Sequence, residues 1–317
     1  MKNRIIAFYY FFKPVIPRRI QLVLRRKRIV KQMATNAHVW PINSGATRLP
    51  PNWSGWPGQK QFALILTHDV ETARGQMKCR ALMNLEMELG FRSSFNFVPE
   101  RYRVSPELRA LLTHYGFEVG VHGLKHDGKL YKSEKIFKQR AIYINRYLKA
   151  WNAVGFRSPA MHHNLQWLHQ LNIDYDASTF DTDPFEPQPD GVKTIFPFSV
   201  MQISPQHWYV ELPYTLPQDS TLFIFMQEHS INIWKEKLAW IAEHGGMALV
   251  ITHPDYMNFS GTKFKVDEYP AQYYAEFLQY IHYYYQDQYW QVLPKELSRF
   301  WLNSYSLKQK TEIAQAM

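Results

Sequence analysis

Short runs of apolar residues alternate with amphipathic segments along most of the chain. A run that is apolar throughout is typical of a strand buried on both faces, and apolar residues three and four positions apart indicate a helix. We predict strands at residues 62–67, 94–98, 118–121, 194–196, 222–225, 248–252 and 291–293. We predict helices at residues 76–89, 106–115, 133–151, 164–171, 231–243 and 271–285. Between residues 174 and 217 the pattern loosens into acidic and Pro-rich loops. The repeated order strand, helix, strand predicts an α/β fold with a parallel sheet and right-handed crossovers.

The alternation belongs to one domain, which we place at residues 59–303. Residues 1–58 precede it as a basic arm and a linker, and the part at 41–58, rich in Pro, Gly, Asn and Trp, is predicted to be a linker or a wrapping loop. Residues 304–317 are assigned to a C-terminal tail. With 317 residues, the chain has room for these extensions and for one α/β barrel, which takes roughly 200–250 residues.

Charge is distributed unevenly along the chain. The net charge is +10, yet the first acidic residue is Asp69, and 12 of the 37 Lys and Arg residues precede it. The rest of the chain holds 25 basic and 27 acidic residues, so the main domain is nearly neutral. A nucleic-acid enzyme should carry its basic groups on the working face, and we therefore expect no nucleic-acid partner.

The basic arm combines apolar and basic positions. Ile16, Ile20, Val23 and Leu24 have helical spacing, and arginines crowd the positions between and around them. Residues 1–34 are therefore predicted either to lie on an anionic membrane surface or to be a solvated arm that crosses the main domain. The first alternative places the protein in the cytoplasm, peripheral to the inner face of the membrane.

Two further features concern the compartment. Cys79 is the single cysteine, so an intrachain disulfide is excluded and nothing points to an oxidising compartment. The apolar stretch at residues 5–12 is too short to span a membrane. No small-residue cleavage site follows this stretch at the right distance, and we predict no signal peptide.

Residue types that bind metals gather just after the predicted strands. Asp69 and Glu71 follow the first strand, and His122 and His126 follow the third. Because strand ends are where α/β enzymes keep their chemistry, we expect these side chains to lie together. A carboxylate, two histidines and an open position are the ligand set of a catalytic zinc-type site. The second carboxylate can then accept a proton from a water molecule.

Two more side chains complete this inventory. Arg157 and a third histidine, His253, each follow an apolar run of their own. An arginine beside a carboxylate keeps it ionised and oriented, and a histidine across the site can give a proton to a leaving group. Together these groups are the ones that the metal-assisted hydrolysis of an amide or ester requires.

The order of these motifs and their local sequences resemble those of the polysaccharide deacetylases of carbohydrate esterase family 4, the NodB-homology type. The five matching motifs are 67–71, 122–126, 157–159, an acidic segment at 181–183 or at 174–176, and 251–253. The resemblance covers about residues 61–256. It implies a single distorted parallel (β/α) barrel of about seven strands, here with a basic N-terminal arm.

The resemblance also implies a role for each motif residue. Asp69 is the expected base, His253 the expected acid, and Arg157 the residue that orients Asp69. Asp181 would in turn hold Arg157.

The same resemblance supplies the expected cofactor and substrate contacts. The cofactor is one divalent metal ion, zinc before others, with Glu71, His122 and His126 as ligands. Ala160 would offer its backbone N–H to an oxyanion, and Ile251 would line the pocket for the acyl group.

The first motif departs from the family's usual pair of adjacent acids. Val70 stands where the metal-binding Asp is expected. Alternate residues of a strand point the same way, so Glu71 can replace the missing ligand beside Asp69. Two alternatives stay open: Asp69 itself binds the metal and Glu71 is peripheral, or the protein keeps the fold without the activity. Glu86 and Glu88, on the helix that follows, are expected at the surface.

We therefore predict a metal-dependent hydrolase that acts on a C–N amide bond. Its substrate is an N-acylated, in the first place N-acetylated, amino sugar of a bacterial polysaccharide or of its lipid-linked precursor. The alternatives are a deformylase or small-molecule amidase on the same fold, and a catalytically inactive carbohydrate-binding protein.

Overall fold

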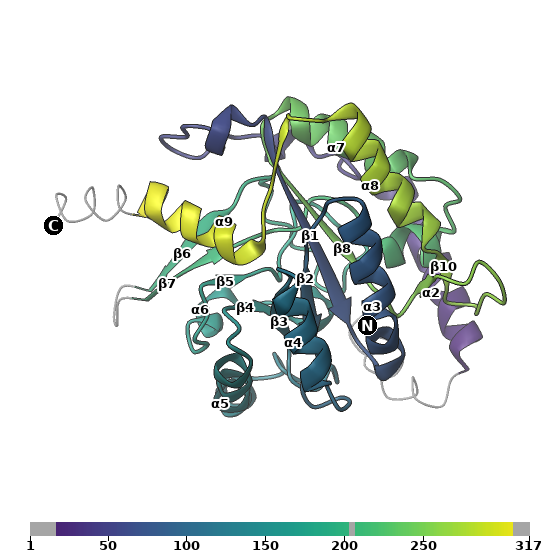
Figure 1. The fold of residues 1–317 in the computed structure, drawn as a ribbon, viewed down its shortest axis with the longest axis horizontal. Coiled ribbons are helices and arrows are strands. Elements are labelled where there is room, and N and C mark those ends of the chain that lie inside the picture. The colour runs from purple at the N-terminus through teal and green to yellow at the C-terminus, as the bar shows by residue number, and fades with distance from the viewer. Residues whose placement is uncertain (1–16, 203–206, 307–317) are drawn as a thin grey trace, which may run out of the picture.

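A curled, mainly parallel sheet forms the centre of the protein (Figure 1). The computed structural model describes residues 17–202 and 207–306. The strands of this sheet are β1 (Phe62–Val70), β2 (Ser94–Phe97), β3 (Glu118–His122), β4 (Gly155–Arg157), β5 (Tyr175–Asp176), β6 (Phe198–Gln202), β7 (His207–Glu211), β8 (Met247–Thr252) and β11 (Tyr289–Gln291). Their order is β11-β1-β2-β3-β4-β5-β7-β6, and β8 also pairs with β1. A second, small sheet contains β9 (Met257–Asn258) and β10 (Tyr269–Pro270).

The sheet confirms the predicted parallel α/β barrel. Within the described ranges eight strands run parallel, against about seven predicted, and only β6 runs antiparallel to its neighbour β7. The hairpin of β6 and β7 lies where we predicted mainly loops. The segment after β7 closes the sheet against β8, because Thr215 N and Leu216 N both donate to Leu249 O at 3.1 Å.

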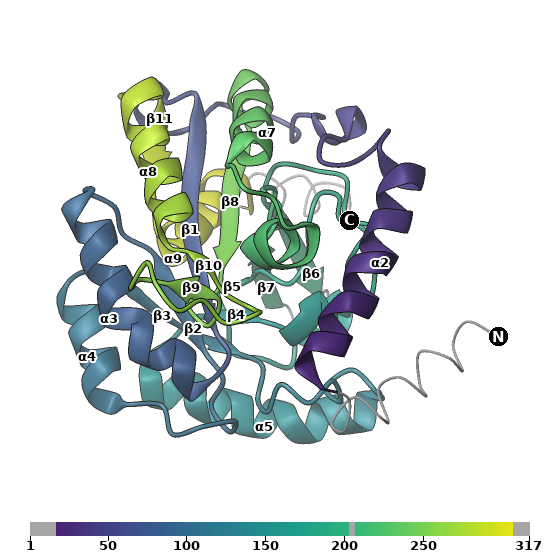
Figure 2. The same ribbon diagram turned by 90° about the vertical axis from the view of Figure 1, so that its right-hand side faces the viewer.

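Helices surround the sheet in a ring (Figure 2). They are α2 (Arg18–Asn36), α3 (Ala73–Glu88), α4 (Pro106–His114), α5 (Glu134–Trp151), α6 (Leu165–Leu168), α7 (Asn232–Glu243), α8 (Gln272–Tyr284) and α9 (Pro294–Trp301). Short 3-10 turns occur at η1 (Ser44–Ala46), η2 (Pro57–Gln59) and η3 (Pro159–Met161), and short π-helices at η4 (Ser220–Met226) and η5 (Leu302–Ser306). Hydroxyl side chains begin three of the helices by accepting a backbone hydrogen bond, namely Thr72, Ser105 and Ser133.

The strand β1 divides the core by the alternation of its side chains. Ala63 and Ile65 pack inside the barrel, in one cluster with Leu249 and Ile251 of β8. Phe62, Leu64, Leu66 and Val70 belong instead to the cluster beneath the helices. Asp69 continues the odd-numbered, inward series, whereas Val70 faces the helices. This alternation directs the acidic side chain into the barrel.

Aromatic side chains close the barrel at the end where its strands begin. Trp56, Trp301 and Leu297 are buried in the same cluster as the interior residues of β1 and β8. Trp56 Nε1 also donates to Gly245 O, two residues before β8, at 2.8 Å. Of the two alternatives predicted for residues 41–58, a linker or a wrapping loop, the structure has the wrapping loop. The opposite end of the barrel stays available for the site.

The helix α2 packs across the domain through one face. Leu22 and Ile29 are each 2% exposed, and Arg26 Nε donates to Ile224 O of η4 at 3.0 Å. Gln32 Nε2 donates to Pro184 O at 2.9 Å. The predicted arm at 1–34 therefore crosses the domain from residue 18 onward, while its first 16 residues, like tail residues 307–317, lie outside the described ranges. Within those ranges, no helix combines the length and the apolar character that a membrane crossing requires.

Two of the predicted strands are wrong. Residues 222–225 lie in the π-helix η4, and all four side chains are buried. This π-helix packs against α2, and Phe223 contacts Trp234 of α7 and Tyr273 of α8. A short run that is apolar throughout does not distinguish a buried strand from a buried helical turn. Residues 194–196 form an irregular turn, in which Thr194 Oγ1 accepts from Phe196 N at 3.1 Å.

Candidate active site

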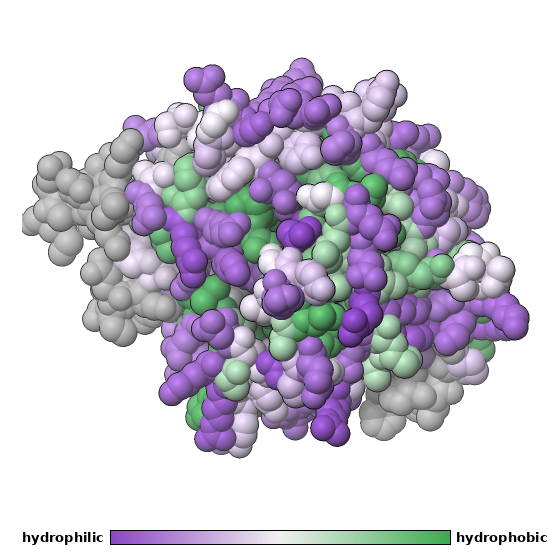
Figure 3. All heavy atoms as spheres, viewed as in Figure 1, coloured by the Kyte–Doolittle hydropathy of each residue, from purple (hydrophilic) through white to green (hydrophobic). Residues whose placement is uncertain are grey.

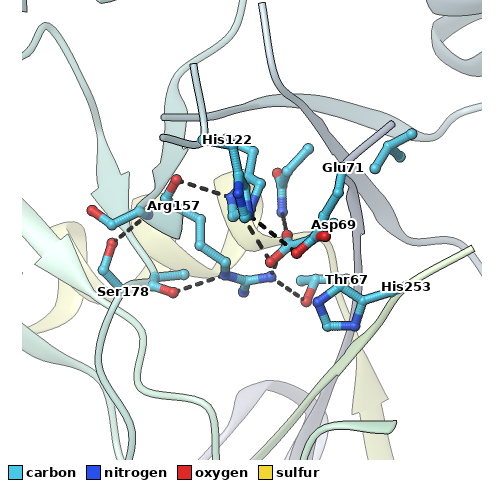
Figure 4. Close-up of polar contacts among 12 residues, drawn as sticks. Thr67, Asp69, Glu71, His122, Arg157, Ser178 and His253 are labelled. Atoms are coloured by element: carbon cyan, nitrogen blue, oxygen red, sulfur yellow. Dashed lines mark hydrogen bonds and ion pairs between the residues drawn. The ribbon is translucent and has the colours of Figure 1, made fainter. Parts of the chain in front are cut away.

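The side chains predicted for the site converge at the carboxyl ends of the strands (Figure 4). Asp69 comes from β1, His122 from β3 and Arg157 from β4, while His253 directly follows β8. Glu71 stands just after β1, and His126 lies in the loop after β3. The structure thus brings together residues that are up to 184 positions apart in the chain.

Glu71, His122 and His126 form a cluster with the geometry of a metal site. One ligand atom from each residue lies within 4.8 Å of the others, and Glu71 Oε1 is 3.1 Å from His126 Nε2. His122 Nδ1 lies 3.2 Å from Arg157 O, which assigns the ring proton to Nδ1 and leaves Nε2 as the free lone pair. Burial lowers the pKa of His122 to about 4, so its imidazole is neutral at pH 7. Two histidines and a carboxylate are a ligand set that fits a divalent transition metal.

Residues that follow β8 support Glu71, and the sequence did not predict them. Asp255 Oδ2 accepts the backbone N–H of Glu71 at 2.9 Å, and Tyr256 donates its hydroxyl to Glu71 Oε2 at 3.4 Å. The helix α3 approaches so closely here that a Cβ added to Gly75 would lie 2.1 Å from Asp255 Oδ2. Only glycine at position 75 therefore leaves room for this support.

Asp69 is buried and held as a carboxylate. Arg157 Nη1 donates to Asp69 Oδ1 at 3.1 Å, and Asn96 Nδ2 donates to the same oxygen at 3.0 Å. Burial opposes ionisation, but Arg157, and after it His122 and His253, outweigh burial and lower the pKa of Asp69 to about 2. Asp69 is therefore an ionised acceptor at neutral pH, beside the metal-site cluster.

The prediction that Asp181 holds Arg157 is wrong. Asp181 Oδ2 is bound to the ammonium group of Lys237 at 2.5 Å, and Lys237 also donates to Pro41 O at 2.6 Å. Arg157 is held by Thr67 Oγ1 and by the backbone carbonyl of Ala177, each at 2.8 Å. Asp181 lies beyond the end of β5, so its carboxylate contacts α7 instead of the site.

His253 forms a buried ion pair with Asp219, a residue that the sequence analysis missed. His253 Nδ1 lies 2.6 Å from Asp219 Oδ1, and Asp219 Oδ2 accepts from His253 N at 2.7 Å and from the Tyr269 hydroxyl at 2.9 Å. Burial alone would lower the pKa of His253, but the charge and hydrogen bond of Asp219 outweigh it and raise the pKa to about 10. His253 is therefore protonated at neutral pH, which suits a proton donor.

Asp219→Asn should separate this pair without removing the histidine. The pKa of His253 falls when its main stabilising charge is lost, so less of the protonated acid is present at neutral pH. We expect turnover to fall about 100-fold, with the alkaline limb of the pH–rate profile shifted to lower pH. Tyr269→Phe, which removes one hydrogen bond to the same carboxylate, is the matched control and should shift the limb less. An unchanged alkaline limb in Asp219→Asn would show that His253 is not the acid.

A buried polar network ties β1 to β8 directly behind the site. His68 Nδ1 lies 2.7 Å from Thr252 Oγ1, and His68 Nε2 lies 2.9 Å from Glu86 Oε1. The hydroxyls of Tyr274 and Ser93 donate to the same carboxyl group at 2.6 Å. Glu86 is thus fully buried, and the prediction that it lies at the surface is wrong. Its polar partners all come from other parts of the chain, which a local pattern does not reveal.

A cavity of about 180 Å³ opens beside His126. Its walls include Tyr131, Lys132, Pro159 and His162. Most of these side chains can donate or accept hydrogen bonds, and Tyr131 adds an aromatic ring to the wall. The cavity therefore has the polar and aromatic lining that suits a sugar.

The two predicted substrate contacts lie in different settings. Ala160 is exposed in η3 and has a positive φ of 54°, next to Pro159 at the cavity wall. Gly123, with φ of 63°, lets the loop after β3 approach this turn, because a Cβ there would lie 2.5 Å from Pro159 Cδ. Ile251 is fully buried in the barrel interior, two residues before His253.

No protein-family model matches the chain, and neither does any curated protein. Solved structures do match. A protein from Mycobacterium smegmatis described as a polysaccharide deacetylase is 18% identical, with a TM-score of 0.63 over 80% of this chain and 94% of that one. A protein from Pseudomonas aeruginosa PAO1 with the same description is 15% identical, with a TM-score of 0.61 over 79% and 94%. The Puue allantoinase is 14% identical, with a TM-score of 0.61 over 79% and 93%. The chain therefore has the polysaccharide deacetylase fold, as its motifs predicted.

Proposed function

We propose that the protein is a metal-dependent N-deacylase that removes an acetyl group from an amino sugar of a polysaccharide or of its lipid-linked precursor. The observation that carries this proposal is the cluster of Glu71, His122 and His126 beside a buried carboxylate and a protonated histidine. The fold shared with polysaccharide deacetylases supports a carbohydrate substrate.

Each side chain has a distinct part in this proposal. A divalent ion held by Glu71, His122 and His126 would lower the pKa of a water molecule and polarise the amide carbonyl. Asp69, kept ionised by Arg157, accepts the proton of the attacking water. His253, kept protonated by Asp219, gives a proton to the amine that leaves. Before the reaction the base is thus deprotonated and the acid protonated, as their two roles require.

An amidase acting on a small molecule is the second candidate. The fold matches the Puue allantoinase with a TM-score of 0.61, close to that of the deacetylase-like proteins. The cavity beside His126, about 180 Å³ in volume, is small enough that it does not favour a long polymer over a single small ligand.

A metal analysis joined to a substrate screen tests the proposal. The purified full chain should contain one divalent transition metal per molecule and release acetate from N-acetylated amino sugars, and a chelator should abolish this release. N-formylated amino sugars and allantoin are the comparison substrates. Faster release of formate, or hydrolysis of allantoin alone, would overturn the acetyl assignment in favour of the alternatives. Bound metal or sugar without turnover of any substrate would overturn the enzyme assignment.

A further inference from the structure

The outward face of α2 carries apolar side chains between basic ones. Ile20, Val23, Leu24 and Val30 are 51%, 47%, 48% and 64% exposed, although Leu22 and Ile29 on the inner face are buried. Lys27 and Lys31 are exposed and share the outward face by helical spacing. The helix contains no acidic residue. Its outer surface is therefore both positive and apolar.

A loop between β9 and β10 repeats this combination. Residues 260–266 are all exposed, and they include the alternating sequence Lys263, Phe264, Lys265 and Val266. Phe264 and Val266 are 46% and 42% exposed. Two lysines and two apolar side chains thus project from one short loop.

The two acidic residues of this loop do not offset its lysines on the surface. Asp267 is 9% exposed and forms an ion pair with Arg74 at 3.3 Å, while Glu268 is bound to Lys78 at 2.9 Å. Asn258 holds the loop in shape, because its side-chain oxygen accepts hydrogen bonds from Ser260 N and Gly261 N at 2.9 and 3.0 Å. The loop is therefore preorganised, with its acids turned inward.

Both features lie on the same side of the molecule. The helix α2 and the loop before β10 both lie toward the right in Figure 1, and in Figure 2 α2 runs along the right-hand edge while β9 and β10 lie left of the centre. Figure 3 shows this side only at its right-hand rim, where hydrophilic and apolar residues are both present. Residues on both sides of this loop reach the candidate active site: Tyr256 donates to Glu71 Oε2 at 3.4 Å, and Tyr269 donates to Asp219 Oδ2 at 2.9 Å.

We propose that the outer side of α2 together with residues 260–266, here called the α2–loop face, binds an anionic phospholipid bilayer. Basic residues near an anionic leaflet attract it electrostatically, and isolated Phe, Leu, Ile and Val side chains can enter the boundary between headgroups and acyl chains. Binding at two separate points fixes the orientation of the protein and keeps the active site near the lipid surface.

The composition of the α2–loop face favours a bilayer over other partners. The centre of a protein–protein interface is depleted of lysine, whereas here Lys27, Lys31, Lys263 and Lys265 alternate with the apolar residues. A nucleic acid would be bound through the basic groups and would gain little from exposed Ile, Val and Leu. A bilayer uses both kinds of side chain at once.

Sedimentation of the full chain with vesicles tests this proposal. The protein should bind vesicles of phosphatidylcholine with one third phosphatidylglycerol, bind less as salt shortens the screening length, and not bind vesicles of phosphatidylcholine alone. Lys27→Gln with Lys31→Gln should lower the partition coefficient about 25-fold, which is about fivefold for each basic residue. Phe264→Ser with Val266→Ser should lower it about tenfold.

Matched controls come from α5, which lies away from α2 in Figure 1. Ile142 is 56% exposed there, and Lys135 and Lys149 are exposed lysines. Ile142→Ser, and Lys135→Gln with Lys149→Gln, should leave vesicle binding unchanged. Circular dichroism and thermal denaturation report whether each variant is folded.

Three outcomes would overturn the proposal. They are no binding of the full chain to the anionic vesicles, equal binding to both kinds of vesicle, and unchanged binding in both pairs of α2–loop variants. A different result would replace the bilayer with a nucleic acid as the partner. In that result the protein binds a nucleic acid but no vesicles, and this binding falls in the lysine variants but not in Phe264→Ser with Val266→Ser. None of these results depends on turnover, so the failure of the proposed hydrolase and the failure of the membrane surface are distinguishable.

Discussion

Asp69→Asn should lower the turnover of an N-acetylated amino sugar about 100-fold or more while the protein keeps its metal. The amide of Asn does not accept the proton of the attacking water, and general-base catalysis contributes about 10²–10⁴-fold. The amide oxygen can still accept from Arg157, although part of the stabilisation of that buried cation is lost. Steady-state kinetics together with metal analysis and thermal denaturation measure the three effects separately.

Glu88→Gln is the matched control for this change, because Glu88 is an exposed acid on α3. It should leave both metal and turnover unaffected. Loss of the metal from Asp69→Asn, with turnover lost as a consequence, would instead make Asp69 a metal ligand. In that case the roles of Asp69 and Glu71 would be exchanged.

Removal of a predicted metal ligand should have the second large effect. His122→Ala leaves Glu71 and His126 as the only members of the cluster, and a two-ligand site binds a divalent ion far more weakly. We expect the loss in metal affinity to exceed the about 10–100-fold that loss of an outer partner of a ligand causes. Glu71→Gln should also lower the metal affinity, since the neutral amide is a poorer ligand than the carboxylate.

His162→Ala provides a stringent control, because His162 lines the neighbouring cavity but is not part of the cluster. The metal affinity of the His162→Ala variant should equal that of the unchanged protein, as measured by competition with a chromogenic chelator. Full metal occupancy in His122→Ala would mean that the metal binds elsewhere.

The parts of the site that the sequence predicts are those carried by strand ends. The alternation of β1 determines that Asp69 faces the barrel interior and Val70 the helices, and this follows from a period of two without any further knowledge. The side chains after β3, β4 and β8 could be predicted for the same reason, because parallel strands end at one edge of the sheet. Their relative distances became known only from the structure.

The residues that were missed or misplaced depend on irregular chain segments. Asp219 stands just before the π-helix η4 and three residues before a run that resembles a strand, so no local pattern marks it as the partner of His253. Asp181 follows a two-residue strand, β5, and nothing in its neighbours indicates that Lys237 of α7 will reach it. Glu86 is polar on a helix, which usually means exposure, yet the side chains of His68, Ser93 and Tyr274 surround its carboxyl group. Long-range pairing decides each of these cases.

The contact of α2 with η4 has a consequence for the order in which the protein folds. Arg26 donates to Ile224 across 198 positions of the chain, so the helix that is synthesised early finds its packing surface only after most of the domain has been made. Contacts of such separation form late because the entropy of closing a long loop opposes them. During synthesis, the apolar inner face of α2, with Leu22 and Ile29, therefore remains unprotected until residue 224 has emerged. A folding assay that follows this helix should show its docking as one of the last events, after the strands of the barrel have paired.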